Sequence, residues 1–287
     1  MSGKFNHIPV LLKESIDFLN VRKGQTYVDC TLGGGGHSQG ILSPLPLGEG
    51  IIGVRVFGIE VDSDALAAAK EKLGNSIEYV HDNFRNLKNH IKKPVAGFLF
   101  DLGVSSYQID EAARGFSIKK DGPLDMRMDK SQKLTASDIL NRSSQEELEK
   151  IFKEYGEERF SRRIAKAVEQ QRPLTTTKQL KEIVEQAIPT WKKRESVTRI
   201  FQALRIAVNQ ELDSLKLALS DAIELLRPGG RIVVISYHSL EDRIVKQTFR
   251  QAEQLKVLTK KPLRANEAEI SSNPRARSAK LRAGEKL

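Results

Sequence analysis

Four consecutive glycines, Gly33 to Gly36, follow an apolar run over residues 26–30 and precede His37. Glycine readily adopts positive φ angles, and it lets a ligand approach the backbone closely. A strand that opens into such a loop and then into a helix is typical of the first unit of a nucleotide-binding α/β fold. The spacing differs from the dinucleotide pattern, because a third glycine would fall at Ser38. The loop therefore favours a nucleoside ligand over a pyrophosphate; a glycine-rich surface turn is the alternative.

An acidic side chain, Glu60, ends the next apolar run, residues 54–60. A carboxylate at this place in a doubly wound sheet accepts hydrogen bonds from both ribose hydroxyls of a nucleoside. An ordinary strand-end carboxylate is the alternative. The glycine loop and the acid together fit S-adenosylmethionine, a nucleoside ligand without a pyrophosphate.

Two later strand ends carry side chains that could complete such a site. Phe84 follows the run 77–81 and could lie against an adenine ring, or it could belong to the core. Asp101 ends the run 95–101 and is followed by a polar loop that reaches Gln108. Ligands of open α/β sheets bind at the carboxyl ends of the strands. We therefore expect Asp101 and its loop to face the ligand, with a purely structural turn as the alternative.

Residues 236–243, Ser-Tyr-His-Ser-Leu-Glu-Asp-Arg, end a further apolar run and start a helix. We expect Ser239 to cap this helix, with Asp242 as the acid of a capping box. His238 could accept a proton or stack on a base, although a strand-end histidine also serves as a structural hydrogen-bonding group. The single cysteine, Cys30, excludes a Cys/His zinc cluster. We expect no metal.

The elements that would position these residues alternate between strand and helix. Strands are expected at 26–30, 54–60, 77–81 and 95–101, with helices at 64–73 and 87–91 and a loop at 43–50. This order predicts a parallel sheet with right-handed crossovers. The next convincing strand, 231–237, follows about 130 residues later, which is far more than a crossover needs.

The stretch between is mostly helical in pattern. Ser144 and Glu147 form a capping-box pair before a helix over 148–155. Further elements are expected as helices at 157–171, 177–187, 196–226 with a break near Asp213, and 240–254, and as a strand at 256–259. Residues 279–283 could be an edge strand of the sheet, as the alternative to a tail that binds RNA. We expect an α/β domain made of residues 1–107 and 214–287, and a helical insertion over 108–213.

The composition and net charge of the chain limit the classes of protein to which it could belong. The chain has 287 residues, of which 39% are hydrophobic and 29% charged, and no apolar run approaches 18 residues. We therefore expect a soluble cytoplasmic protein without a membrane contact or a targeting segment. The net charge is +10, and residues 243–287 contribute twelve Lys/Arg against four Asp/Glu. This excess predicts a polyanionic partner such as RNA, with a solvated surface as the alternative.

Read together, nine segments resemble the bacterial small-subunit ribosomal RNA (cytosine-N4)-methyltransferase family. They occur in family order over nearly the whole chain, at His7–Leu12, Asp29–Ser38, Asp101–Gln108, Arg114–Ser117, Asp121–Asp129, Tyr155–Phe160, Phe201–Ile206, Ser236–Lys246 and Asn273–Ser278. The most specific are Asp-Gly-Pro-Leu-Asp-Met-Arg-Met-Asp and His-Ser-Leu-Glu-Asp-Arg. The resemblance implies a class I S-adenosylmethionine-dependent methyltransferase, a Rossmann-like doubly wound α/β sheet with an all-helical insertion.

The resemblance also implies which residues bind S-adenosylmethionine. They are Gly35, Gly36, His37, Glu60, Phe84, Asp101 and Gln108. The family usually has Asp where this chain has Glu60, whose longer side chain should still reach the ribose. The implied reaction is N4-methylation of a cytosine in the decoding region of the 16S ribosomal RNA of the small subunit. The insertion and the basic tail would then bind RNA, and a homodimer stays open.

The cytosine amino nitrogen is a poor nucleophile because its lone pair is delocalised into the ring. Such a reaction requires the nitrogen to be held in line with the methyl group, at about 3–3.5 Å, and acceptors for its protons. We expect Asp101 and its loop to provide these, with His238 as a second catalytic candidate. Three alternatives stay open: a methyltransferase for a small molecule or a protein, a non-catalytic RNA-binding assembly factor, and a nicotinamide dehydrogenase, which the missing third glycine disfavours.

Overall fold

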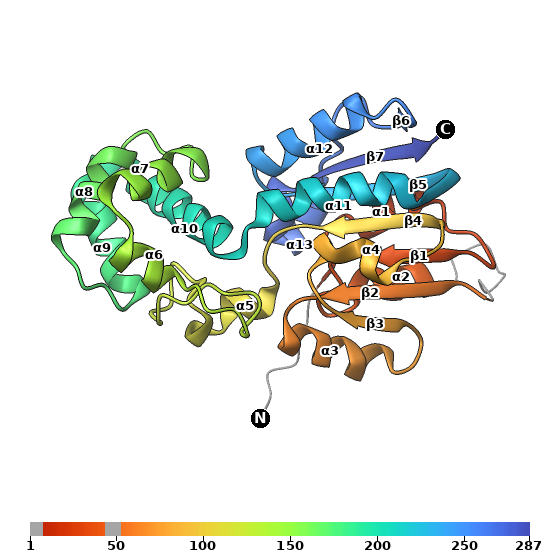
Figure 1. The fold of residues 1–287 in the computed structure, drawn as a ribbon, viewed down its shortest axis with the longest axis horizontal. Coiled ribbons are helices and arrows are strands. Elements are labelled where there is room, and N and C mark those ends of the chain that lie inside the picture. The colour runs from red at the N-terminus through yellow and green to blue at the C-terminus, as the bar shows by residue number, and fades with distance from the viewer. Residues whose placement is uncertain (1–7, 44–52) are drawn as a thin grey trace. The chain divides into compact units, whose positions relative to one another are not determined.

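The computed structural model describes residues 8–43 and 53–287 of the chain. The chain forms two compact units, one of residues 1–105 and 212–287 and the other of residues 106–211 (Figure 1). Most of the loop expected at 43–50 lies outside the described residues. Within the described part, no helix is both long and apolar enough to cross a membrane.

The first unit is built on one seven-stranded sheet with the order β3-β2-β1-β4-β5-β7-β6. Its strands are β1 (Thr26–Asp29), β2 (Arg55–Glu60), β3 (Glu78–His81), β4 (Val95–Asp101), β5 (Leu226–Ser236), β6 (Leu255–Val257) and β7 (Lys280–Lys286). The first five run parallel, whereas β7 is antiparallel to both β5 and β6. The doubly wound parallel sheet predicted from the strand pattern is therefore confirmed.

Helices cover both faces of this sheet, because alternate strand residues point to opposite faces. They are α1 (Leu12–Leu19), α2 (Gly36–Leu42), α3 (Ser63–Leu73), α4 (Leu87–His90), α11 (Glu211–Leu225), α12 (Ser239–Gln251) and α13 (Glu267–Ser272). Val28 and Val234 belong to the core that α4, α11 and α12 close. Tyr27 and Val233, their chain neighbours, belong to the core that α1, α2 and α3 close.

Two strand predictions need correction. The edge strand considered for 279–283 is part of β7, which lies inside the sheet between β5 and β6. The expected strand at 231–237 begins five residues earlier, at Leu226. Its Arg-Pro-Gly-Gly segment enters the sheet where the pairing with β4 shifts register between Val95 and Gly97. The sequence pattern therefore predicted only the regular part of β5, from residue 231 onward.

The second unit is helical. Its helices are α5 (Ser106–Asp110), α6 (Ala136–Arg142), α7 (Gln145–Glu154), α8 (Ser161–Gln170), α9 (Thr177–Ala187) and α10 (Lys193–Asn209). The capping box of α7 is present, with the Ser144 hydroxyl accepting from the Glu147 N–H at 3.2 Å. The long helix expected over 196–226 breaks at Gln210, which has a φ of 50°. This break separates α10 from α11 three residues before the expected position.

Candidate active site

The carboxylate of Asp29 connects the end of β1 to the helix after the glycine loop. Its two oxygens accept hydrogen bonds from the Thr31 N–H at 3.2 Å and from the Ser38 hydroxyl at 2.7 Å. The side chain is fully buried, and burial raises the pKa of Asp29. Asp29 therefore fixes the path of the loop from inside the fold. Its position four residues before Gly33 was the only sequence signal for this role.

The glycine loop is held by close packing as well as by its backbone conformation. Gly35 has a φ of +75°, and a Cβ atom there would lie 2.6 Å from a methyl carbon of Leu73 on α3. A Cβ at Gly36 would lie 3.1 Å from Pro9. Because glycine has no side chain, Leu73 can pack against Gly35 and Pro9 against Gly36. A Cβ at Gly33, by contrast, would meet only one backbone oxygen, 3.9 Å away, so the open side of the loop is at Gly33.

Glu60 joins this loop to the carboxyl end of β2. Its Oε2 accepts a hydrogen bond from the Gly33 N–H at 2.7 Å, and its Oε1 accepts one from the Asp62 N–H at 2.9 Å. Burial raises the pKa of Glu60 to about 7, against the opposing effect of these backbone donors. Each carboxylate oxygen has a second lone pair. Glu60 can therefore position the loop and still accept a hydrogen bond from a ribose hydroxyl.

Asp101 ends β4 with its carboxyl group between two other polar side chains. Its Oδ1 accepts a 2.7 Å hydrogen bond from the Tyr237 hydroxyl, and its Oδ2 lies 3.5 Å from His37 Nδ1. Its backbone N–H donates to the Thr31 hydroxyl at 2.6 Å. The side chain is only 12% exposed, and burial raises the pKa of Asp101 to about 7. The strand end therefore presents a carboxyl group that changes charge near neutral pH.

His37 is buried and faces Asp101 as a neutral ring. Its Nε2 lies 3.1 Å from the carbonyl oxygen of Val10, which can only accept, so Nε2 carries the proton. Nδ1 is then an acceptor for a protonated Asp101. Burial lowers the pKa of His37, in agreement with a neutral pair. The ring is 4% exposed, so a ligand could reach His37 mainly through its backbone.

Tyr237 was not singled out from the sequence, although it stands within the segment 236–243. The tyrosine follows β5 in the chain, and β5 pairs directly with β4. This pairing brings its hydroxyl to Asp101, which lies 136 residues earlier. The tyrosine could have been found only by predicting that these two strands are neighbours.

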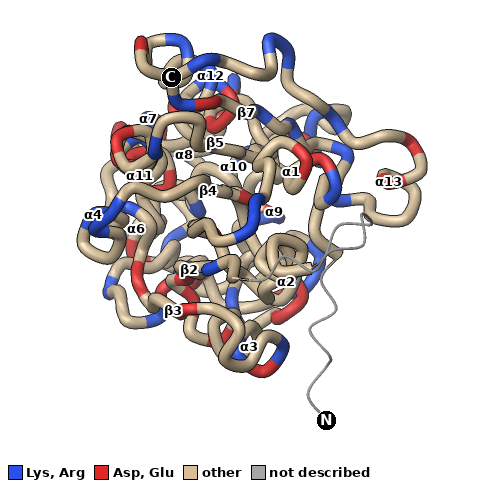
Figure 2. Tube along the Cα trace, turned by 90° about the vertical axis from the view of Figure 1, so that its right-hand side faces the viewer, with Lys and Arg blue, Asp and Glu red and all other residues tan. Residues whose placement is uncertain are grey.

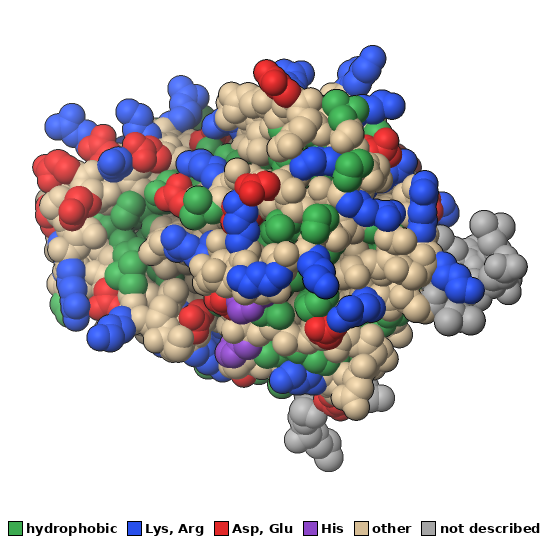
Figure 3. Space-filling model, turned by 45° about the vertical axis from the view of Figure 1, so that its right-hand side comes forward, with side chains coloured by type: hydrophobic (Ala, Val, Ile, Leu, Met, Phe, Trp, Pro, Cys, Tyr) green, Lys and Arg blue, Asp and Glu red, His purple; other side chains and the backbone are tan. Residues whose placement is uncertain are grey.

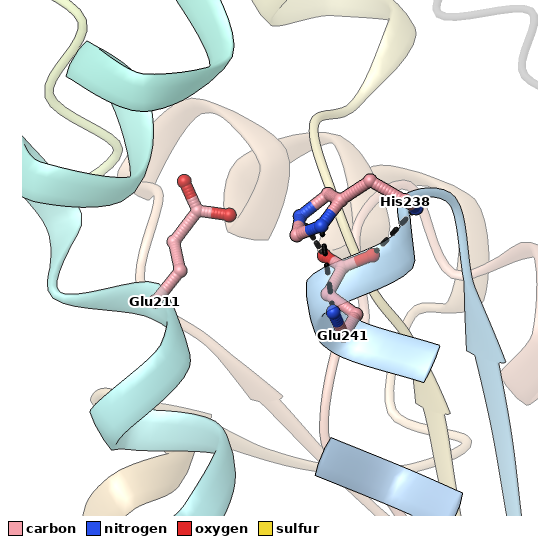
Figure 4. A group of neighbouring side chains, drawn as sticks. All are labelled: Glu211, His238 and Glu241. Carbon is pink, nitrogen blue, oxygen red and sulfur yellow. Dashed lines mark hydrogen bonds and ion pairs between the residues drawn. The ribbon is translucent and has the colours of Figure 1, made fainter. Parts of the chain in front are cut away.

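His238 starts α12, and this corrects the cap predicted there. His238 itself is the N-cap residue, and Glu241, not Asp242, completes the capping box. His238 Nδ1 accepts from the Glu241 N–H at 3.4 Å, and Nε2 lies 3.1 Å from a Glu241 carboxylate oxygen (Figure 4). Asp242 instead binds Arg282 of β7 at 2.7 Å. The helix begins one residue earlier than expected, because a histidine ring accepts the hydrogen bond that we assigned to the Ser239 hydroxyl.

Phe84 belongs to the first unit and Gln108 to the second. Phe84 starts a short 3-10 helix after β3, and its ring packs edge-on against Phe100 with 5.9 Å between centroids. This contact supports the interpretation of Phe84 as a core residue, although the side chain stays partly exposed. Gln108 belongs to α5 of the helical unit and is 4% exposed.

Residues 121–129, one of the two most specific motifs of the family resemblance, belong to the helical unit. Polar side chains fix the conformation of this segment. Asp125 binds Arg127 through two hydrogen bonds of 2.8 Å. Asn209 donates to the Met126 carbonyl and accepts from the Met128 N–H, both at 2.8 Å. The segment therefore has a structural explanation that periodicity could not provide.

The basic tail is divided between structural and exposed cations. Arg282 and Lys280 lie 2.7 and 3.6 Å from Asp242, and Lys286 donates to the Ile223 carbonyl at 2.6 Å. Eight others are exposed: Arg243, Lys246, Arg250, Lys256, Lys260, Lys261, Arg264 and Arg277. Figure 2 marks Lys and Arg in blue along the chain around α12 and β7. On the face drawn in Figure 3, basic side chains are dispersed among acidic and apolar ones. Part of the charge excess therefore stabilises the sheet.

Known proteins match this chain over nearly its whole length. Residues 4–287 match the model of the MraW methylase family. The chain is 47% identical to the ribosomal RNA small subunit methyltransferase H of Halothermothrix orenii, over 98% of each protein. It is also 47% identical to the protein of that name from Carboxydothermus hydrogenoformans, over 99% of each. The corresponding Trichormus variabilis protein is 49% identical, over 98% of this chain and 92% of the relative.

These matches extend over both units, and they confirm the family resemblance and the class I methyltransferase fold predicted from the motifs. The doubly wound sheet, the glycine loop after β1 and the acids at the ends of β2 and β4 are the parts of that fold that face the candidate site. The chain belongs to the MraW methylase family and is a methyltransferase.

Proposed function

We propose that this methyltransferase transfers a methyl group to the amino nitrogen N4 of a cytosine in the decoding region of 16S ribosomal RNA. Its cofactor is S-adenosylmethionine. Relatives that match the whole chain are named as methyltransferases of small-subunit ribosomal RNA, and the motif resemblance implies the base and the atom. The observation that carries the proposal is the buried carboxyl group of Asp101 at the end of β4, with a pKa of about 7.

The residues at the strand ends fit the cofactor. Glu60 has acceptor positions left for the ribose hydroxyls, and Gly33 provides the open side of the loop. Gly35, Gly36 and His37 would contribute backbone groups, since their side-chain positions face protein atoms. Phe84 would offer the exposed part of its ring to the adenine, and Asp101 and Gln108 would complete the site.

S-adenosylmethionine, when bound, supplies a methyl group on a positively charged sulfur, which is a good leaving group. Asp101 would accept a hydrogen bond from the cytosine amino group and so make the nitrogen lone pair more available. The cytosine nitrogen would accept this methyl group from the sulfur and would then carry an excess proton. An Asp101 carboxylate with a pKa of about 7 can take this proton at neutral pH.

His238 caps α12 through Nδ1, which accepts from the Glu241 N–H. Its Nε2 is buried 3.1 Å from a Glu241 carboxylate oxygen and forms no hydrogen bond within the described residues. Asp101 is better placed for the chemistry, because its carboxyl group ends β4 beside His37, which follows the glycine loop. We therefore assign the chemistry to Asp101, with Tyr237 and His37 holding its carboxyl group. The helical unit of residues 106–211 and the exposed cations of the tail would bind the RNA. We place this activity in the cytoplasm, with the small ribosomal subunit as partner.

The proposal is tested with purified protein, isotopically labelled S-adenosylmethionine and small subunits from cells that lack this protein. The labelled RNA is digested and its nucleosides are separated. We expect the label in N4-methylcytidine, and we expect Asp101→Ala to abolish most of it. Label on a ring carbon or on another base would contradict the proposal.

A further inference from the structure

Trp191 is the only tryptophan of the chain, and its side chain is 77% exposed. It lies in the short 3-10 helix η3 (Thr190–Lys192), which leads into α10. The chain is anchored on both sides, because Ile188 is 5% exposed and Ser196 only 2%. Indole rings are enriched where a protein binds a partner, since they offer a large rigid apolar face. A firmly anchored backbone thus holds an aromatic face in solvent.

Three cations follow this tryptophan directly: Lys192, Lys193 and Arg194. They occupy the N-cap and the first turn of α10, where the helix dipole disfavours positive charge. Glu195, the acid of this turn, is shared by Lys192 at 2.7 Å and by Arg199 at 2.6 Å.

The positive charges of Lys193 and Arg194 are therefore not compensated by acidic side chains of the fold. Neither forms an ion pair within the part of the chain that the structure describes. The Lys192 ammonium lies 5.1 Å from the centroid of the Trp191 ring. A basic turn that is unfavourable for its own helix and directly follows an exposed ring points to a function other than stability.

We propose that Trp191 is a stacking platform for an unpaired base of the ribosomal RNA substrate, with Lys193 and Arg194 contacting the phosphates beside that base. This inference rests on the proposed function. Proteins bind unpaired bases on aromatic faces and track the backbone with cations, and the stacking tolerates any base. The uncompensated positive charge favours RNA over a protein partner.

Tryptophan fluorescence tests the platform directly, because excitation at wavelengths that tyrosine does not absorb selects Trp191, the only tryptophan. The full-length protein is titrated with an unpaired RNA of about ten nucleotides and, as a control, with a duplex of the same length. We expect saturable quenching by the single strand and much weaker quenching by the duplex. Quenching only by intact small subunits, and not by their naked RNA, would assign the platform to a protein and overturn the proposal.

Variants separate the ring from the charges. Trp191→Ala should weaken RNA binding roughly tenfold, and Trp191→Phe should keep most of the affinity. Leu134→Ala is the matched control, because Leu134 is another exposed apolar side chain of the helical unit, at 43%. It should bind RNA as the unchanged protein does. Equal affinity of Trp191→Ala and Leu134→Ala would refute the platform.

The cations are tested by the salt dependence of RNA binding. Replacing Lys193 and Arg194 with Gln should reduce the log–log slope by about 1.4, at about 0.7 for each contact with a single strand. Lys92 and Lys93, which precede β4 in the first unit, are exposed and provide a control with the same change in charge. Their replacement should leave the slope nearly unchanged, and an equal effect of both pairs would refute a local phosphate contact. If Trp191 fails these tests while the protein still labels ribosomal RNA, the platform is wrong and the proposed function stands.

Discussion

Replacing Asp101 with Asn should stabilise the cofactor-free protein while it abolishes most of the activity. The two hydrogen-bonding positions of the side chain are kept. An Asn oxygen can accept from the Tyr237 hydroxyl, and an Asn amide can donate to His37 Nδ1, as a protonated Asp101 does. The change therefore removes only the titration of a buried acid.

The size of the effect follows from the pKa of Asp101, which burial raises from 3.8 to about 7. Between these pH values the folded protein holds a proton that the unfolded chain has released. The stability of the Asp101 protein therefore falls as the pH rises from about 4 to about 7, and it is constant above that. At 1.36 kcal/mol per pH unit, the loss is up to about 4 kcal/mol. Asn does not titrate, so the Asp101→Asn protein does not lose this stability as the pH rises.

Urea unfolding followed by circular dichroism at pH 4, 5.5 and 8, without cofactor, checks this prediction. The advantage of Asp101→Asn in the free energy of unfolding should be near zero at pH 4 and largest at pH 8. Glu60 titrates in the same range, but it does so in both proteins and cancels in the difference. An advantage that does not depend on pH, or none at pH 8, would show that Asp101 is not a neutral buried acid in the folded protein.

Three further predictions concern the site and the tail. Tyr237→Phe removes a hydrogen bond that lowers the pKa of Asp101, so the midpoint of the pH–rate profile in single turnover should move to higher pH; an unchanged midpoint would separate this bond from the chemistry. Glu60→Ala should weaken S-adenosylmethionine binding by roughly 1–3 kcal/mol in calorimetry, and wild-type affinity would place the ribose elsewhere. Arg277→Gln with Lys260→Gln should flatten the salt dependence of RNA binding without lowering thermal stability, whereas deleting residues 280–287 removes β7 from inside the sheet and should unfold the first unit.

The parts of the fold with strong local signals could be predicted from the sequence. β4 falls at residues 95–101 as expected, because it is a continuous apolar run that ends at an acid. α9 falls at residues 177–187, where a threonine and a glutamine form its capping box. The charged residues of β7 allow either an edge strand or a solvated tail, whereas β7 lies inside the sheet between β5 and β6. Arg282 is in fact 6% exposed, since Asp242 of α12 neutralises it.

The site shows the same division between local and long-range information. Glu60 and Asp101 were recognised as strand-end acids, and their partners were not. Tyr237 reaches Asp101 only because β5 pairs with β4 across the helical insertion. The packing of Leu73 against Gly35 likewise joins two segments that are far apart in the chain. Such contacts depend on which elements become neighbours, and a residue pattern along one segment does not contain that information.

The most direct test of the proposed reaction is mass spectrometry of small-subunit ribosomal RNA from cells that lack this protein and carry either the unchanged chain or Asp101→Asn. We predict that the unchanged chain restores one methyl group on the amino nitrogen of a decoding-region cytosine. We predict that Asp101→Asn, although at least as stable, restores little or none of it. Full methylation by Asp101→Asn would contradict the role of this carboxyl group, and a methyl group on another atom would contradict the proposed reaction.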